Sequence, residues 1–266
     1  MPLGNPGDVT DWKRQVLAGV RWHLSRRDFL KAAATGAAAL AGASMLGRPP
    51  LLHAADTPTP VKTGTFFFPR LMFHVKDETG DQWNLHPIGD VILRKRLAEL
   101  TNINVSQEAV VVKLADLDRL CRYPFVFATS EGYFDLPGNE EKNLKEFLNR
   151  GGFILADDCV LRNDGDRFFR DYIKMINNLF PANPMREVPK DHEIYHCYFD
   201  FPDGIPDVRG TRLDAHGLFE KGTGRIMTYV APVDLHCGWC CTYFAREKNE
   251  AAIRMGINII IYYLTH

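Results

Sequence analysis

Short apolar runs alternate with helix-like repeats through most of this chain, and that alternation constrains the fold more than any other feature. Apolar runs that suit buried strands occupy residues 65–68, 109–114, 123–128 and 153–156. Apolar residues recur at helical spacing over 87–100, 138–149, 166–180 and 248–263. Strands that alternate with helices favour a mainly parallel sheet covered by helices on both faces.

The pattern changes in the last third of the chain. Residues 184–209 are rich in Pro, Asp and aromatic side chains and are predicted to be irregular. Two further apolar runs, 211–219 and 225–230, flank Lys221-Gly222-Thr223-Gly224, which is typical of a hairpin turn. We therefore predict a three-layer α/β fold. Its sheet is mainly parallel, doubly wound and flavodoxin-like, with a late antiparallel hairpin.

The first 55 residues differ from the rest in charge. They carry seven basic and three acidic side chains, a net charge of +4, against −5 for the remainder of a chain whose formal total is −1. Arg26-Arg27 is followed by Phe29-Leu30 and then by the uncharged, Ala-rich stretch 32–47. This order resembles a twin-arginine export signal, which implies the export machinery as a partner and the periplasm as the destination.

Cleavage of this signal is left open by the sequence. Ala41-Gly42-Ala43 fits a cleavage motif but lies inside the apolar stretch, and Ala54 and Ala55 lack a small residue two positions earlier. An uncleaved signal would anchor the protein, so membrane contact is expected only through this segment. We expect a signal segment at 1–55, a linker at 56–63 and one α/β domain at 64–266.

Composition narrows the class of protein further. A hydrophobic content of 45% excludes a wholly disordered chain. The near-neutral net charge of −1 supplies no global basic field for nucleic acid, so we expect no nucleic-acid partner.

Polar residues follow three of the expected strands. They are Ser130-Glu131-Gly132, Asp157-Asp158 and Asp234. Ligands of open α/β sheets bind outside the carboxyl ends of the strands, so these residues predict a polar site there. Adjacent residues of a strand point to opposite faces, so one of Asp157 and Asp158 would face the pocket as an acid, a base or a metal ligand. The other would cap a helix, and a capping role for both is the alternative.

Four segments of the chain carry a resemblance to a known family. They are Tyr123 to Gly132, Asn149 to Cys159, Pro189 to Ile194 and Gly256 to Thr265. Together they resemble the bacterial domain of unknown function family 4159, over roughly residues 64–266. That family resembles class I glutamine amidotransferase-like folds, including trehalose-utilisation proteins. The resemblance implies a loop at Asp191-His192 and adds His192 to the candidate catalytic residues, although Glu193 stands where the family pattern has Pro.

The resemblance also makes Cys159 a test case. Active amidotransferases carry the cysteine nucleophile in a Gly-x-Cys-x-Gly turn, whereas this chain reads Asp157-Asp158-Cys159-Val160-Leu161. Both glycines are missing, and neighbouring carboxylates disfavour the thiolate that attack requires. We predict that Cys159 is not an amidotransferase nucleophile.

A second cluster is rich in cysteine and histidine. His236, Cys237 and Cys240 form a short motif, and His196-Cys197 or His192 could complete a set of four metal ligands. The alternatives are a disulfide and plain packing of buried thiols in a loop. No cofactor follows from the sequence, and a divalent metal is left open.

Two more residues complete the predicted ligand-binding set. Arg70 follows the first expected strand and is expected to pair with Asp157, Asp158 or an anionic ligand, or else to form a surface salt bridge. Trp239 offers a stacking surface for a sugar, or else covers the core. Our reading is an exported protein that binds a small molecule, a sugar or a cell-envelope component without amidotransferase activity. The alternatives are a hydrolase that uses Asp, Glu and His, with or without a metal, and a scaffold in a periplasmic complex.

Overall fold

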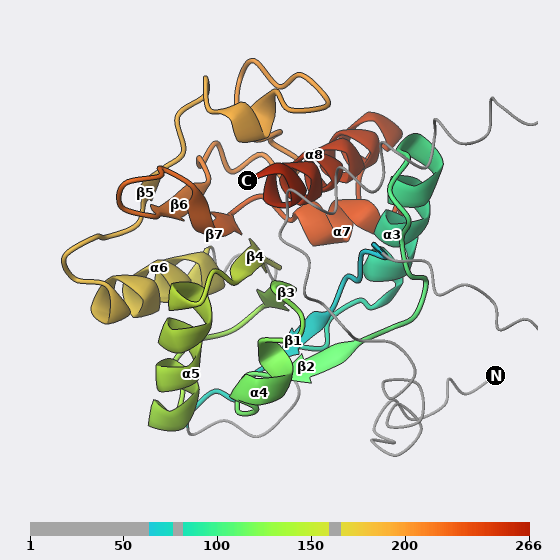
Figure 1. The fold of residues 1–266 in the computed structure, drawn as a ribbon. Helices are drawn as coiled ribbons and strands as arrows, with labels where there is room; N and C mark the ends of the chain where they lie inside the picture. Colours follow the sequence, from blue (N-terminus) through green and yellow to red (C-terminus); the bar gives the residue numbers. More distant parts are fainter. Residues whose placement is uncertain (1–63, 77–81, 160–165) are drawn as a thin grey trace, which may run out of the picture.

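The computed structural model describes residues 64–76, 82–159 and 166–266 (Figure 1). The predicted export signal, with Arg26, Arg27, Phe29 and Leu30, lies outside these residues. The described chain forms a seven-stranded sheet in the order β2-β1-β3-β4-β7-β6-β5. The strands are β1 (Arg70–Met72), β2 (Val111–Lys113), β3 (Phe125–Ser130), β4 (Phe153–Asp158), β5 (Arg186–Glu187), β6 (His216–Phe219) and β7 (Ile226–Ala231).

Most of the sheet is parallel, as predicted. Strand β1 pairs in parallel with β2 and β3, β3 pairs with β4, and β4 pairs with β7. With β7 taken as the fifth strand, this reproduces the flavodoxin-like order 2-1-3-4-5. Strands β6 and β5 add to β7 in antiparallel fashion, so the predicted late hairpin is confirmed at one edge of the sheet.

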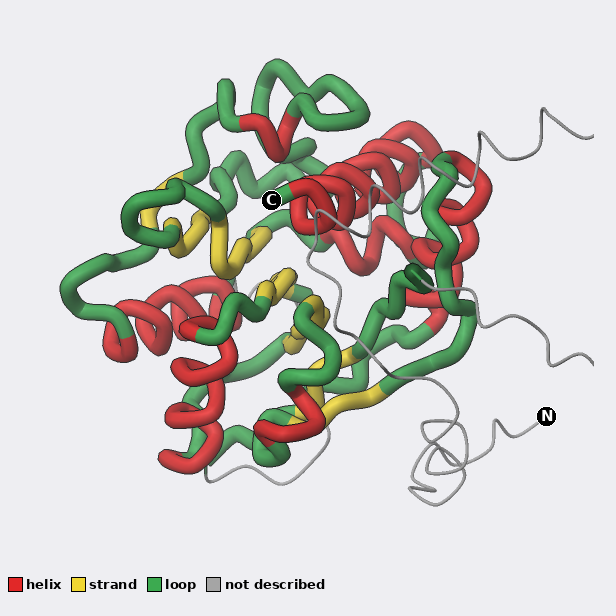
Figure 2. Tube along the Cα trace, viewed as in Figure 1, coloured by secondary structure: helices red, strands yellow, loops and turns green. Residues whose placement is uncertain are grey.

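Helices cover both faces of the sheet (Figures 1 and 2). One face carries α3 (Ile88–Leu100), α7 (Leu235–Trp239) and α8 (Arg246–Thr265). The other face carries α4 (Leu117–Leu120), α5 (Gly138–Asn149) and α6 (Arg167–Leu179). A short 3-10 helix, η1 (Glu193–Tyr195), packs against α8. The three-layer α/β prediction is therefore confirmed.

The two central strands divide their side chains between these layers. Phe125 and Phe127 of β3 join the core under α3, α7 and α8, whereas Val126 and Ala128 join the core under α5 and α6. Strand β4 runs in matching register, with Ala156 opposite Ala128. Strand side chains alternate between faces, so the two aspartates that end β4 must diverge into different layers.

The amino-terminal edge of the sheet differs from the prediction in one respect. Residues 65–68 were expected to form a strand, but they contribute only an isolated bridge between Phe66 and Val105. Pro69 has no N–H to donate, yet its carbonyl oxygen accepts from Phe127 N at 2.8 Å, and regular pairing begins at Arg70. Arg70 therefore starts the first strand instead of following it.

The segment after β7 was expected to be a loop, and it contains α7. Its five residues include Gly238, where an added Cβ would lie 2.4 Å from Ala252 Cβ of α8. Such a short helix has little intrinsic stability and depends on packing and capping, which the local sequence pattern does not display. Among the described residues, no helix combines the length and the apolar character that a membrane span requires.

Candidate thiol and imidazole site

The two aspartates at the end of β4 each hold the start of a helix. Asp157 accepts the backbone N–H groups of Leu235 and His236, at 3.0 and 2.9 Å, and so caps α7. Asp158 accepts the backbone N–H of Phe169 at 2.9 Å and so caps α6 on the other face. The predicted divergence of the pair is confirmed, and both carboxyl groups make the capping contacts that were expected of one.

Burial dominates the electrostatics of this pair. Asp157 and Asp158 are 0% and 1% exposed. Burial, helped by the nearby charge of Asp234, raises the pKa of Asp157 well above its usual value. Burial raises the pKa of Asp158 to about 7, although the Phe169 N–H opposes the shift. Neither carboxyl group has the solvent access that a general acid or base needs in order to reach a substrate.

The residues that end β3 lie beside the aspartates. Ser130 lies opposite Asp158 in the sheet, and its buried Oγ accepts the backbone N–H of Gly132 at 3.0 Å. Gly132 packs so closely on Gln82 that an added Cβ would lie 2.0 Å from Oε1. Glu131 is half-buried, with Oε1 4.0 Å from Cys159 Sγ. Ser130 and Gly132 therefore shape the edge of the sheet, while Glu131 faces the thiol.

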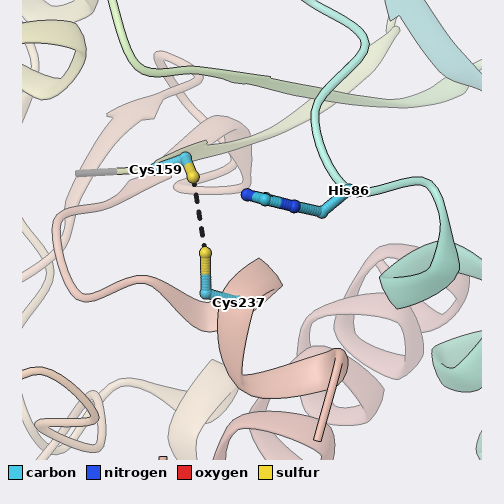
Figure 3. Close-up of side chains that lie close together, drawn as sticks. All are labelled: His86, Cys159 and Cys237. Carbon is cyan, nitrogen blue, oxygen red and sulfur yellow. Dashed lines mark hydrogen bonds between the residues drawn. The ribbon is translucent and has the colours of Figure 1, made fainter. Parts of the chain in front are cut away.

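Two thiols and one imidazole meet at this edge (Figure 3). Cys159 follows β4, Cys237 lies on α7, and their Sγ atoms are 3.4 Å apart. A ring nitrogen of His86, from the segment before α3, completes a group whose ligand atoms all lie within 4.8 Å of one another. Both thiols are buried and unoxidised. The hydrogen bond to Cys159 and burial together raise the pKa of the Cys237 thiol. We call these three residues the Cys-Cys-His trio.

His86 is held in an unusual backbone conformation. Its φ is 41°, in the left-handed region that non-glycine residues rarely occupy. Tyr243 Oη lies 3.1 Å from its Nδ1, which leaves Nε2 as the nitrogen available to a ligand. Asp234 and Cys241, which flank α7, also have positive φ values, both 60°. Non-glycine residues in this region cost free energy and tend to cluster at functional sites.

Cys240 stands apart from the trio, although it belongs to the same short motif as Cys237. Its Sγ donates to the carbonyl oxygens of His236 and His86, at 3.4 and 3.9 Å. Burial raises the pKa of the Cys240 thiol to about 12. Cys240 thus joins α7 to the segment that carries His86 and contributes no atom to the trio.

The prediction that His236 joins Cys237 as a metal ligand is wrong in this structure. The His236 side chain is fully buried, with Nε2 3.0 Å from Arg70 Nη2 and 3.2 Å from Asp90 Oδ1. Burial and the Arg70 charge lower the pKa of His236 to about 4, so its ring is neutral at pH 7. Because neighbouring residues of a helix point in different directions, His236 turns toward Arg70 while Cys237 turns toward Cys159.

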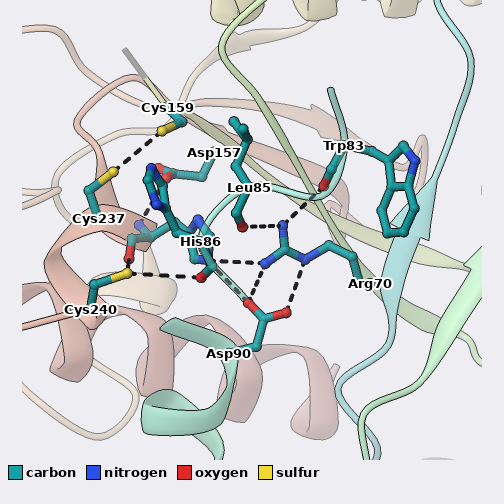
Figure 4. A network of polar contacts seen from close by, with 10 residues as sticks. Arg70, Trp83, Leu85, His86, Asp90, Asp157, Cys159, Cys237 and Cys240 are labelled. Atoms are coloured by element: carbon teal, nitrogen blue, oxygen red, sulfur yellow. Dashed lines mark hydrogen bonds and ion pairs between the residues drawn. The ribbon is translucent and has the colours of Figure 1, made fainter. Parts of the chain in front are cut away.

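Arg70 is the centre of this second network (Figure 4). Its Nε and Nη2 donate to the two carboxylate oxygens of Asp90 at 3.0 and 2.6 Å, and Nη1 donates to the carbonyl oxygens of Trp83 and Leu85 at 3.1 Å each. Burial alone would raise the pKa of Asp90, but Arg70 and His236 outweigh it and lower that pKa. The expected pairing of Arg70 with Asp157 or Asp158 is therefore wrong. Its ion pair is buried, so it is not a surface salt bridge either.

Two other predicted site residues, His192 and His196, lie away from the trio. His192 packs its ring on Phe219 and on Tyr262, whose hydroxyl accepts from Ile226 at the amino end of β7. His196 lies 2.5 Å from Asp200 and 2.9 Å from the Lys190 carbonyl, with one ring nitrogen on each. These two histidines belong to the irregular segment around η1, so they complete no site with Cys237. Their expected catalytic and metal-binding roles find no geometric support.

The last two predicted site residues differ in position, because Trp239 is part of the core and Asp234 lies at the carboxyl edge of the sheet. Trp239 is fully buried and donates its indole N–H to the Ala252 carbonyl at 2.9 Å, so it is a core residue and offers no stacking surface. Asp234 does lie at the carboxyl edge, where it begins α7 and approaches Arg209 at 3.7 Å.

Sequence reasoning missed His86 and Asp90. The available signal was position, because His86 directly precedes Pro87 and α3 in the connection that follows β1. Connections that leave the carboxyl end of a parallel strand are where ligand-binding residues concentrate.

Fold and site together define a class: a three-layer α/β domain with a buried Cys-Cys-His trio at the carboxyl edge of a mainly parallel sheet. The chain belongs to the family described as Domain of unknown function (DUF4159), whose model matches residues 71–264. That match spans all three members of the trio. No curated protein matches the chain.

Proposed function

We propose that this chain is an exported protein that binds a small ligand through the Cys-Cys-His trio and has no amidotransferase activity. The observation that carries the proposal is the convergence of Cys159, Cys237 and His86 from three separate segments, with all ligand atoms within 4.8 Å. Export to the periplasm is part of the proposal and rests on the sequence around Arg26-Arg27 and Phe29-Leu30. An amidotransferase-like fold is likewise proposed, with support from the flavodoxin-like strand order.

The surroundings of Cys159 support the absence of amidotransferase activity. Its sulfur lies 3.4 Å from a second thiol and 4.0 Å from the Glu131 carboxylate. The nucleophile of active amidotransferases stands in a Gly-x-Cys-x-Gly turn, and this chain has neither glycine around Cys159, whose sulfur faces the Glu131 carboxylate.

Binding fits the geometry better than carboxylate hydrolysis does. A hydrolase of that kind needs two carboxyl groups that reach the substrate, one as acid and one as base or nucleophile. Asp157 and Asp158 are instead buried against helix N-termini. The Cys-Cys-His trio lies at the same edge and takes no part in this helix capping.

The proposal is tested on the reduced full-length protein in two assays. Thermal unfolding is measured against a panel of sugars, amino acids, cell-wall fragments and divalent metals, and ammonia release is measured with glutamine. We expect at least one ligand to raise the unfolding temperature in the wild type and in the control Cys121→Ser, but not in Cys159→Ser. Cys121 is the control because it lies before β3, outside the trio.

Two results would overturn the proposal. The first is glutamine turnover that Cys159→Ala abolishes, because that would make Cys159 a nucleophile. The second is a panel in which every ligand effect survives Cys159→Ser, because binding would then lie elsewhere.

A further inference from the structure

We infer that the ligand of the trio is a thiophilic metal ion of the Zn²⁺ class, bound by the sulfurs of Cys159 and Cys237 and by a ring nitrogen of His86. This inference rests on the proposed function and names the ligand for the same site. Two thiolates and an imidazole are the donor set that zinc and soft metals prefer, whereas Mg²⁺ and Ca²⁺ prefer oxygen.

The separation of the two sulfurs favours a metal over a disulfide. Zn–S bonds of about 2.3 Å in a tetrahedron place two sulfurs about 3.8 Å apart. The observed distance between Cys159 Sγ and Cys237 Sγ is 3.4 Å, a few tenths of an ångström shorter. A disulfide has an S–S length of about 2.05 Å, so closing it would require a movement of more than an ångström. The metal geometry requires a change of only a few tenths of an ångström between the two sulfurs.

The contacts around the trio resemble the support that metal ligands receive. Metal-bound histidines usually engage their second ring nitrogen with a polar partner, which fixes the ring and its tautomer. Tyr243 Oη occupies that position, 3.1 Å from His86 Nδ1. Cys240 adds a hydrogen bond to the His86 carbonyl, and the strained φ of 41° is thereby held in place. These contacts orient the imidazole toward the two sulfurs in the metal-free protein.

Asp157 positions the other half of the site. By capping α7 at Leu235 and His236, it fixes the helix that presents Cys237. Cys159 follows Asp157 by two positions on the same segment, so the carboxyl end of β4 fixes the positions of both sulfur atoms. The ligand geometry is therefore built by the fold and needs little rearrangement on binding, which favours affinity.

Three protein ligands leave one position of a tetrahedron for another donor. Glu131 Oε1 lies 4.0 Å from Cys159 Sγ, close enough for the carboxylate to reach that position directly or through a water molecule. Both cysteines bind as thiolates, so loading the site releases the protons of both thiols to solvent. No change in oxidation state is involved.

The test uses the reduced full-length protein, stripped of metal, with Co²⁺ as a spectroscopic probe and Zn²⁺ in competition against a chromophoric chelator. We expect one ion per chain and a thiolate-to-cobalt charge-transfer band that Zn²⁺ abolishes. Cys159→Ser and Cys237→Ser should each weaken the band and lower Zn²⁺ affinity at least 100-fold. Tyr243→Phe should lower affinity about 10- to 100-fold and leave the band in place, because only the support of His86 is lost.

Matched variants locate the site. Cys121→Ser and Cys197→Ser should bind Zn²⁺ as the wild type does, since neither thiol belongs to the trio. His86→Ala should keep the thiolate band at reduced affinity. Unfolding temperatures of the metal-free variants, compared with that of the metal-free wild type, separate loss of a ligand from loss of the fold.

Four outcomes would overturn the inference. They are a wild type that binds neither ion, binding that is unchanged in Cys159→Ser, a loss in Cys240→Ser as large as in Cys237→Ser, and a Cys159–Cys237 disulfide that forms and resists treatment with a reductant. If the metals fail while another ligand shows Cys159-dependent stabilisation, the metal inference falls and the proposed function stands. If no ligand of any class shows that dependence, both fall.

Discussion

The carboxylate of Asp157 accepts the backbone N–H of His236 at 2.9 Å, and this contact ties the end of β4 to the start of α7. The same carboxylate also accepts the Leu235 N–H. Helix α7 has five residues, too few to be stable alone, so it depends on this contact and on packing against α8. The position of Cys237 follows from that of Asp157.

Asp157→Ala should lower the free energy of unfolding by about 2–5 kcal/mol, because it leaves two buried N–H donors without an acceptor. Asp157→Asn should cost less, since the amide oxygen still accepts one N–H. Chemical denaturation monitored by circular dichroism measures both effects. Asp203→Ala, at an exposed turn, is the control and should stay within about 0.5 kcal/mol of the wild type. Equal midpoints for Asp157→Ala and Asp203→Ala would contradict the capping role.

Gly238→Ala should destabilise the protein by about 1–3 kcal/mol through overpacking. An added methyl group would lie 2.4 Å from Ala252 Cβ, where α7 crosses α8. Ala252→Gly alone should cost about 1 kcal/mol as a glycine within a helix. The double variant should lose less than the sum of the two, because one methyl group makes room for the other. Strict additivity in the denaturation midpoints would show that the two positions do not meet.

Arg70→Met should lower the free energy of unfolding by about 3–5 kcal/mol, because Asp90 would keep a buried charge after losing its bidentate partner, with the His236 ring as its neighbour. Adding Asp90→Asn should restore part of the loss by removing that charge. Arg150→Met is the control, since its partner Glu146 lies on an exposed helix face, and its midpoint should barely move. A double variant no more stable than Arg70→Met would refute the buried-charge explanation.

Two histidines outside the trio should respond to pH with opposite signs. Burial lowers the pKa of His192 below 6.5, so the stability it supports is present above pH 6.5 and is lost as the pH falls through the folded-state pKa. In a pH series of unfolding midpoints, the stability of His192→Asn relative to the wild type should therefore increase as the pH falls below 6.5. Asparagine is chosen because it can still accept the Ile194 N–H that His192 accepts.

His196 provides the contrast. Its contact with Asp200 raises the pKa of His196 above 6.5, so its contribution is present below pH 6.5 and is lost as the pH rises through the folded-state pKa. The difference between wild type and His196→Asn should shrink at high pH. If the stability difference from the wild type changed with pH in the same direction for both variants, the opposite pKa shifts of His192 and His196 would be contradicted.

The repeating parts of the fold could be predicted from the sequence. Apolar runs and helical spacing located α5, β4 and α8 to within a few residues, because each buries a continuous face and its side chains repeat with a fixed period. The divergence of Asp157 and Asp158 followed from the same strand period. Helix α7 could not be predicted in this way, because it depends on Asp157, 78 positions before Leu235, and on packing against α8.

The candidate site could be predicted only in part. The sequence predicted that Asp157 and Asp234 lie at the carboxyl edge, and the structure places them there, but it brings Cys159 and His86 to Cys237 instead of the histidines that were expected. His236 adjoins Cys237 in the sequence, whereas Cys159 is 78 positions away. Spacing detects ligands that share one local motif. It does not detect ligands that reach one point from separate connections of a sheet.

The assembly of the trio from three distant segments has a practical consequence. An unfolded chain holds Cys159, Cys237 and His86 far apart on average, so their combined chemistry exists only in molecules whose sheet has formed. A cross-link between Cys159 and Cys237, identified by peptide mapping, would therefore report the fraction of native protein in a sample, whereas Cys237, Cys240 and Cys241 are close together even in the unfolded chain. The yield of this cross-link would then measure the folding yield during expression and refolding.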